Sequence, residues 1–130
     1  MEAAVDQVAR LTLAEPALVD PARLAQLYER FGAQRGEDLV CRAMEELAFR
    51  LGQAARLYET GDRAELRSCA GALATLADEI GMTVLRRVAE SVALCIDSAD
   101  AVALAAVLAR MARVGERSLY AIWDLQDLTI

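Results

Sequence analysis

The sequence predicts an all-α protein, an up-down four-helix bundle with one or two additional helices at its N-terminus. Ala, Leu, Glu and Arg dominate the chain, and these residues favour helices. Apolar residues recur at intervals of three and four along most of its length, which is the period of an amphipathic helix. The links between the long periodic segments are short, so consecutive helices should be antiparallel neighbours. No segment has the alternation typical of a strand.

The length of 130 residues suits one ordinary domain, and a hydrophobic content of 56% is enough for a sizeable core. We expect residues 17–130 to form the bundle domain and residues 1–16 to form an N-terminal helical extension. Val5, Val8 and Leu11 give the extension a short apolar stripe, which Pro16 ends. It is interpreted as a docking helix, a dimerisation element or a frayed tail.

Two helices are predicted in the first half of the bundle domain. Asp20 and Pro21 form a typical helix start, an N-cap followed by proline at the first helical position. The expected core side of this first helix consists of Leu24, Leu27, Tyr28 and Phe31. Gly32 and Gly36 are expected to bracket the link to a long helix over 37–58. Its core side consists of Leu39, Ala43, Leu47, Leu51 and Ala54.

Three further helices are predicted after residue 60. Asp62 should cap a helix through residue 79, with Glu65 in the capping-box position. Gly81 permits a sharp turn into a helix over 82–96, whose core side is Val84, Leu85, Val88 and Val92. Asp97 or Ser98 should cap the last helix, over 99–125. Its expected core residues are Val102, Leu104, Val107, Leu108, Met111, Val114, Leu119 and Ile122.

Composition argues against several functions. The net charge of −6 disfavours a nucleic-acid partner, because phosphate binding needs a basic face. All 14 basic residues are arginines, and the absence of Lys and His excludes a lysine Schiff base, histidine catalysis and histidine metal ligands. Glu37, Glu45 and Glu46 are therefore interpreted as a solvated acidic face. We expect no enzyme activity, no cofactor and no metal.

Cys41, Cys69 and Cys95 are odd in number and widely spaced, so they do not suggest a disulfide framework. They are interpreted as small buried hydrophobic residues in a reducing cytosol, with a three-thiolate metal site as the alternative. The first residues lack the features of a signal peptide, and no apolar run reaches the length of a membrane span. The expected location is cytoplasmic, without membrane association.

The most informative segment is 57–94. Gly61-Asp62 marks one helix break and Ile80-Gly81 marks the next, and Gly71 lies ten residues from Gly61 and from Gly81. This pattern resembles the central hairpin of histidine-containing phosphotransfer (HPt) domains, where an Ala-His-x-x-Lys-Gly-like motif lies between two such breaks. The resemblance covers roughly residues 20–127. It places the phospho-accepting position at Gly71, the family lysine at Ala74 and the family glycine at Thr75.

The helical phase also indicates which way Gly71 points. At about 100° per residue, the apolar side chains of the helix over 62–79 fall within one arc of roughly 120°, which is the predicted buried face. That face consists of Leu66, Cys69, Ala70, Leu73, Leu76 and Ala77. Gly71 falls about 160° from the centre of this arc, and Arg67, Ser68, Thr75 and Asp78 lie on the same outward side. The phase therefore predicts an exposed Gly71, as the resemblance requires.

The resemblance implies a non-catalytic HPt-like module of two-component phosphorelay signalling. Gly71 has no nucleophile, and we expect the hydroxyls of Ser68 and Thr75 to cap or solvate the helix. The module would bind a response-regulator receiver domain or a histidine kinase without accepting phosphate. Its docking face would comprise Arg67, Ser68, Gly71, Ala74, Thr75 and Asp78. Drift after loss of function and a retained docking face are both open explanations of Gly71.

Two other functions are considered. One is a structural homodimer formed through residues 1–16 or through the last helix. The other is a bundle that carries a small ligand in its core, which would need convergent polar groups at buried positions. Tyr120 and Trp123 are interpreted as aromatic anchors of the last helix, with a partner contact as the alternative.

Overall fold

The computed structural model describes residues 18–128, all of whose regular secondary structure is helical. The predicted all-α class is therefore confirmed, whereas the predicted extension over 1–16 lies outside the described residues. The five helices are α2 (Pro21–Phe31), α3 (Ala33–Thr60), α4 (Arg63–Glu79), α5 (Thr83–Asp97) and α6 (Ala101–Leu128).

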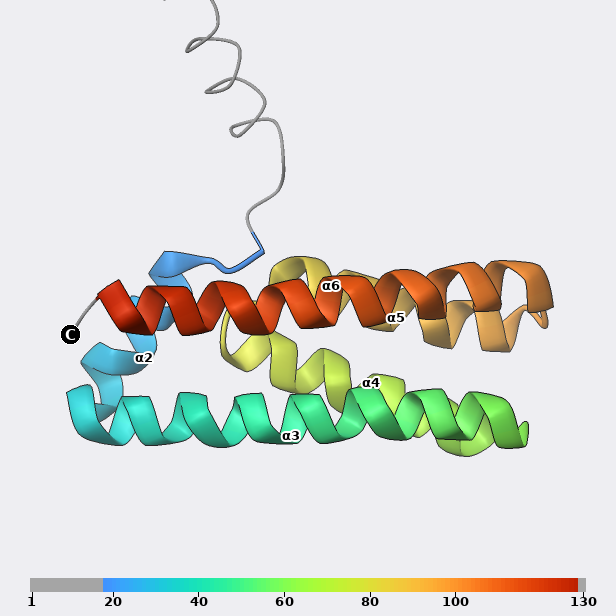
Figure 1. Ribbon diagram of the computed structural model, residues 1–130, viewed down its shortest axis with the longest axis horizontal. Helices are drawn as coiled ribbons and strands as arrows, with labels where there is room; N and C mark the ends of the chain where they lie inside the picture. The colour runs from blue at the N-terminus through green and yellow to red at the C-terminus, as the bar shows by residue number, and fades with distance from the viewer. Residues whose placement is uncertain (1–17, 129–130) are drawn as a thin grey trace, which may run out of the picture.

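The helices pack around an aliphatic core. Each of α3, α4 and α5 packs against the next helix in the chain, α6 also contacts α3, and α2 packs against α3. Figure 1 shows α3 and α6 as two long rods, with α4 and α5 behind them. The most completely buried side chains come from all four long helices. They include Val40, Leu47, Leu66, Leu73, Leu85, Val92 and Ile122.

Two predicted helix starts are confirmed by their hydrogen bonds. The Asp20 carboxylate accepts from the Ala22 amide at 3.0 Å, with Pro21 at the first helical position. The Asp62 carboxylate accepts from the Glu65 amide at 3.1 Å. Such caps satisfy amides that have no partner inside the helix, and each contributes typically about 1 kcal/mol.

The predicted link between the first two helices is wrong at Gly36. Gly32, with φ 84°, is the only residue between α2 and α3, and Gly36 lies buried within α3. A Cβ at Gly36 would come within 2.6 Å of Tyr28 Cδ1. Gly36 thus allows the two helices to approach closely and does not interrupt α3. This helix begins at Ala33, four residues before the predicted start at residue 37.

The predicted cap of the last helix is also wrong. Asp100 caps α6, because its carboxylate accepts from the Ala103 amide at 3.0 Å. Asp97 and Ser98 belong to the end of α5. Val102, predicted as a core residue, is 83% exposed. It lies two positions before the buried Leu104, hence about 200° away around the helix, on its outer side.

The cysteines do not all lie in the core. Cys69 is buried and Cys95 is half-buried, but Cys41 is exposed. Val40 is fully buried, and the next residue of a helix is turned by about 100°, which brings Cys41 to the surface. Glu37, Glu45 and Glu46 are exposed, as predicted. Within residues 18–128, no helix combines the length and the apolar character needed to cross a bilayer.

Candidate functional site: the Gly71 face of α4

Gly71 lies in the middle of α4 with its Cα turned to solvent. A Cβ added at this position would have no neighbouring atom within 4 Å. The opposite side of α4 is buried, as the helical phase predicted, through Leu66, Cys69, Ala70, Leu73 and Ala77, with Leu76 half-buried. The predicted exposure of Gly71 is confirmed.

The residues around Gly71 form a largely exposed surface. Arg67, Ser68, Thr75 and Asp78 are exposed with Gly71, whereas Ala74 is half-buried against the core. The Thr75 hydroxyl donates to the Gly71 carbonyl at 3.1 Å. This bond runs back to a carbonyl within α4, so Thr75 does not cap an end of the helix, and its hydroxyl is occupied by backbone. We call the surface made by Arg67, Ser68, Gly71, Ala74, Thr75 and Asp78 the Gly71 face.

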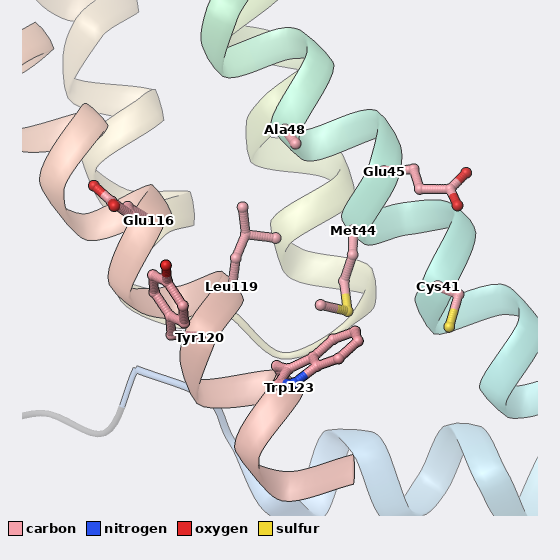
Figure 2. Close-up of a pocket in the computed structure, with 8 residues that line it drawn as sticks. All are labelled: Cys41, Met44, Glu45, Ala48, Glu116, Leu119, Tyr120 and Trp123. Carbon is pink, nitrogen blue, oxygen red and sulfur yellow. The ribbon is translucent and has the colours of Figure 1, made fainter. Parts of the chain in front are cut away.

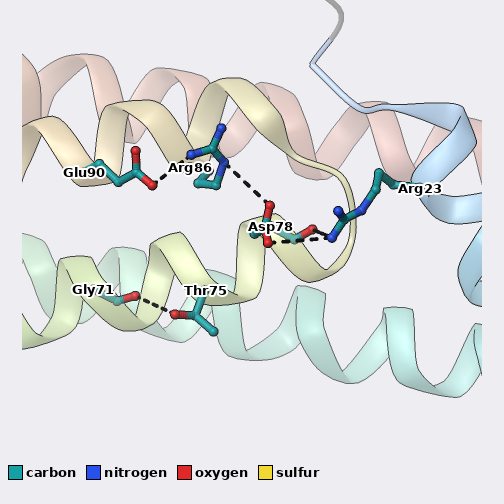
Figure 3. A network of polar contacts seen from close by, with 6 residues as sticks. All are labelled: Arg23, Gly71, Thr75, Asp78, Arg86 and Glu90. Atoms are coloured by element: carbon teal, nitrogen blue, oxygen red, sulfur yellow. Dashed lines mark hydrogen bonds and ion pairs between the residues drawn. The ribbon is translucent and has the colours of Figure 1, made fainter.

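Ion pairs hold the charged side chains at both ends of the Gly71 face. Arg67 donates twice to the Asp97 carboxylate, at 2.8 and 2.9 Å. At the other end, the Asp78 carboxylate lies 3.6 Å from nitrogens of both Arg23 and Arg86 (Figure 3). Arg23 also donates to the Asp78 backbone carbonyl at 2.7 Å. These contacts connect α4 to α2 and α5 at the two ends of the Gly71 face.

The pair at Arg67 shifts the ionisation of both partners. The hydrogen bond from Arg67 holds the pKa of the Asp97 carboxyl below its ordinary value. The same hydrogen bond raises the pKa of the Arg67 guanidinium. Both side chains are exposed, so solvent screens the attraction, and the pair fixes geometry more than it adds stability.

Neither Gly71 nor Thr75 is suited to accept a phosphoryl group. Gly71 has no side chain, and the Thr75 hydroxyl is bonded to backbone without a base beside it. Cys69 is adjacent in sequence but buried, where its thiol donates to the Arg50 carbonyl at 3.2 Å. Burial raises the pKa of this thiol, which disfavours the nucleophilic thiolate. Across the described part of the chain, no three His, Cys, Asp or Glu residues gather in a metal-binding arrangement.

Comparison with known proteins adds no identification. No protein-family model matches the chain, and no significant match exists among curated proteins or solved structures.

Sequence reasoning missed the partners that fix the Gly71 face. Arg23, Arg86 and Asp97 reach it from other helices, and the periodicity within one helix does not reveal such contacts. Asp97 was misassigned because an Asp-Ser pair before a helix is typical of an N-cap. The sequence singled out Tyr120 and Trp123 as anchors of the last helix, with a partner contact as the alternative. Both are mostly exposed, which corrects the interpretation as anchors and leaves the alternative open.

Proposed function

We propose that this protein is a non-catalytic HPt-like module that docks a response-regulator receiver domain through the Gly71 face without accepting phosphate. The observation that carries the proposal is the open position of Gly71. It lies at mid-helix, ten residues from each flanking glycine, with no atom within 4 Å of an added Cβ. In a variant of the same proposal, the partner is a histidine kinase that carries a similar docking surface.

The fold we propose for this function is an up-down four-helix bundle formed by α3 to α6. The contacts support it, because they connect α3 to α4, α4 to α5, α5 to α6 and α6 back to α3. The colours of Figure 1 support it too, since the chain reverses direction from each of these helices to the next. In this arrangement α2 is an additional helix beside the bundle.

The chemistry of the Gly71 face suits docking and not transfer. Without a side chain at Gly71, the backbone of a partner can approach α4 closely. Arg67 and Asp78 flank the glycine and are already paired with side chains of neighbouring helices, which reduces the side-chain freedom that binding would remove.

The test compares two substitutions that introduce the same side chain. Gly71→Glu places a bulky charge in the centre of the Gly71 face, whereas Ala106→Glu places it at an exposed position of α6. Binding is measured by calorimetry against a panel of receiver domains, and folding by thermal unfolding. We expect Gly71→Glu to weaken binding by roughly tenfold or more, as for a blocked interface centre. Its melting temperature should be unchanged or higher, because glutamate favours helix more than glycine.

Ala106→Glu should leave both measurements unchanged. Equal affinities for the wild type and Gly71→Glu would show that the Gly71 face is a relic of an ancestral site. A panel in which no receiver domain binds the wild type would reject the proposed function.

A further inference from the structure

A second surface feature lies on the other side of the molecule, between α3 and α6. It is an apolar groove with a volume of about 480 Å³. We call it the α3–α6 groove, and none of its lining residues belongs to α4. The lining residues, all shown in Figure 2, are Cys41, Met44, Glu45, Ala48, Glu116, Leu119, Tyr120 and Trp123.

The groove has an apolar floor between two acidic rims. Figure 2 shows Met44, Leu119 and Trp123 extending into the space between the helices. Glu45 and Glu116 point outward on opposite sides, one on the α3 flank and one on the α6 flank. Both glutamates are exposed. The charge therefore lies along the edges, and the floor is left to apolar contact.

The apolar seam continues along the same pair of helices. A second pocket of about 280 Å³ lies farther along, and its only charged lining residue is Glu59. Its remaining lining residues are Leu51, Ala54, Ala55, Tyr58, Ala105, Leu108, Ala109, Met111 and Ala112. Between the two pockets Gly115 packs against Leu51, where an added Cβ would lie 2.6 Å from Leu51 Cδ1. From Cys41 to Glu59 the seam follows about 27 Å of helix, at ~1.5 Å per residue.

The large aromatic side chains of the groove remain uncovered. Trp123 is 59% exposed and Tyr120 is 65% exposed. Trp and Tyr are the residues most enriched at the centres of protein interfaces, because they bury a large area at a small cost in side-chain entropy. Two of them beside an apolar floor indicate a surface that is covered by a partner.

We propose that the α3–α6 groove binds an amphipathic helix of a partner protein, whose apolar stripe is flanked by basic residues. Helix-in-groove recognition needs an elongated apolar floor, which the seam provides. The charged side chains that line the two pockets, Glu45, Glu59 and Glu116, are all acidic, so basic flanks complement them. The net charge of −6 steers a basic segment toward the protein and opposes an acidic one.

Trp123 gives a direct readout, because it is the only tryptophan of the chain. The probe is a synthetic helix of about 18 residues, five turns at ~3.6 residues per turn, with leucines on one stripe, lysines on both flanks and no aromatic residue. A matched peptide carries glutamates in place of the lysines. Titrating the full chain with the lysine peptide should shift Trp123 emission to shorter wavelength, and the glutamate peptide should not.

Charge reversal at the rims tests the specificity. In the double variant Glu45→Arg/Glu116→Arg, the affinity for the lysine peptide should fall by roughly tenfold or more at low salt, and the affinity for the glutamate peptide should rise. Gly71→Glu should leave the titration unchanged, because Gly71 is not in the groove. Peptide binding in the groove without receiver docking at the Gly71 face would therefore separate this proposal from the proposed function. Receiver docking without peptide binding would do the same.

Three results would overturn the proposal. The first is an emission that neither peptide shifts, and the second is an equal response to both peptides. The third is a groove that is already covered in the free chain. Emission that shifts to longer wavelength on dilution would identify a second copy as the occupant. A shift of the emission to longer wavelength caused by the double substitution Val5→Asp/Leu11→Asp in the full chain would identify the N-terminal segment as the occupant.

Discussion

Arg67 and Asp97 form a bidentate ion pair in which two guanidinium nitrogens donate to the two carboxylate oxygens at 2.8 and 2.9 Å. The pair ties the second turn of α4 to the last residue of α5. Asp97 does not cap the last helix, because it still belongs to α5, and the cap is Asp100, which directly precedes Ala101. The pair also fixes Arg67 at one end of the Gly71 face.

The first prediction concerns the pH dependence of this pair. Hydrogen bonding to Arg67 lowers the pKa of Asp97 below its ordinary value of 3.8. A carboxyl whose pKa is lower in the folded state stabilises the fold above its unfolded pKa. That contribution is lost as the pH falls through the folded value. In an NMR titration, Arg67→Ala should therefore raise the midpoint of the Asp97 carboxyl, and added salt should do the same in the wild type.

Arg87→Ala is the matched control, because it removes an exposed arginine of α5 and leaves the pair intact. The Asp97 midpoint should not move in this variant. An equal shift in the two variants would show that general surface charge, and not the hydrogen bond from Arg67, sets the pKa of Asp97.

The second prediction contrasts two glycines ten residues apart. Gly71→Ala should stabilise the fold by up to about 1 kcal/mol, because alanine favours helix and the added Cβ meets no atom. Gly81 has φ 77°, and an added Cβ would lie 2.9 Å from Arg23 Cβ and 3.0 Å from the Asp20 carbonyl oxygen. Gly81→Ala should therefore cost at least about 1–2 kcal/mol.

Chemical denaturation of the two variants measures both effects. Opposite signs would support a turn that requires Gly81 and an open surface at Gly71. A stabilising Gly81→Ala would contradict the left-handed turn between α4 and α5.

Much of the fold could be predicted from the sequence because helices carry local signals. The caps at Asp20 and Asp62 and the burial phase of α4 depend on residues within a few positions of one another. The error at Asp97 is one of helix length, because α5 extends through Asp97 and the cap of α6 falls on Asp100. The error at Gly36 arose where another helix decides the outcome. Gly36 resembles a helix breaker until Tyr28 is known to pack on it.

The same reason limits the prediction of surface sites. The exposure of Gly71 follows from the phase of one helix, so it could be predicted. The α3–α6 groove requires Met44 and Trp123, almost eighty residues apart in the chain, to lie across from each other. No local pattern in the sequence predicts that these two residues lie close in space, although the Tyr120–Trp123 pair pointed to the region.

The third prediction orders the three thiols by reactivity. Cys41 is exposed, Cys95 is half-buried, and Cys69 is buried with its thiol donating to the Arg50 carbonyl. Burial also raises the pKa of Cys69, which lowers its thiolate fraction at a given pH. Ellman's reagent at mildly alkaline pH should therefore modify Cys41 first and Cys69 last in the native protein.

Single Cys→Ser variants assign the kinetic phases to the individual thiols, and unfolding in denaturant should make the three rates similar. Rapid modification of Cys69 in the native state would contradict its burial in the core. Because Cys41 lines the α3–α6 groove, the lysine peptide used as a probe should also slow its modification.

The last prediction concerns phosphotransfer. Incubated with a phosphorylated receiver domain, or with a kinase and labelled ATP, the wild-type chain should acquire no acid-labile label, because it contains no histidine. Gly71→His has room for an imidazole on the open face, yet it should restore little transfer. The positions that the HPt resemblance assigns to lysine and glycine are Ala74 and Thr75, and without the lysine the phosphoryl charge has no cationic partner there.

The triple variant Gly71→His/Ala74→Lys/Thr75→Gly should accept more label than Gly71→His. Ala74 is half-buried, so a lysine stem can pack along α4 while its ammonium group reaches solvent beside the histidine. Thermal unfolding of each variant shows whether the bundle remains intact. Equal labelling of the single and triple variants would show that the lysine position matters less than the HPt resemblance implies. Folded variants that neither bind nor accept label from any receiver domain would separate the Gly71 face from phosphorelay signalling altogether.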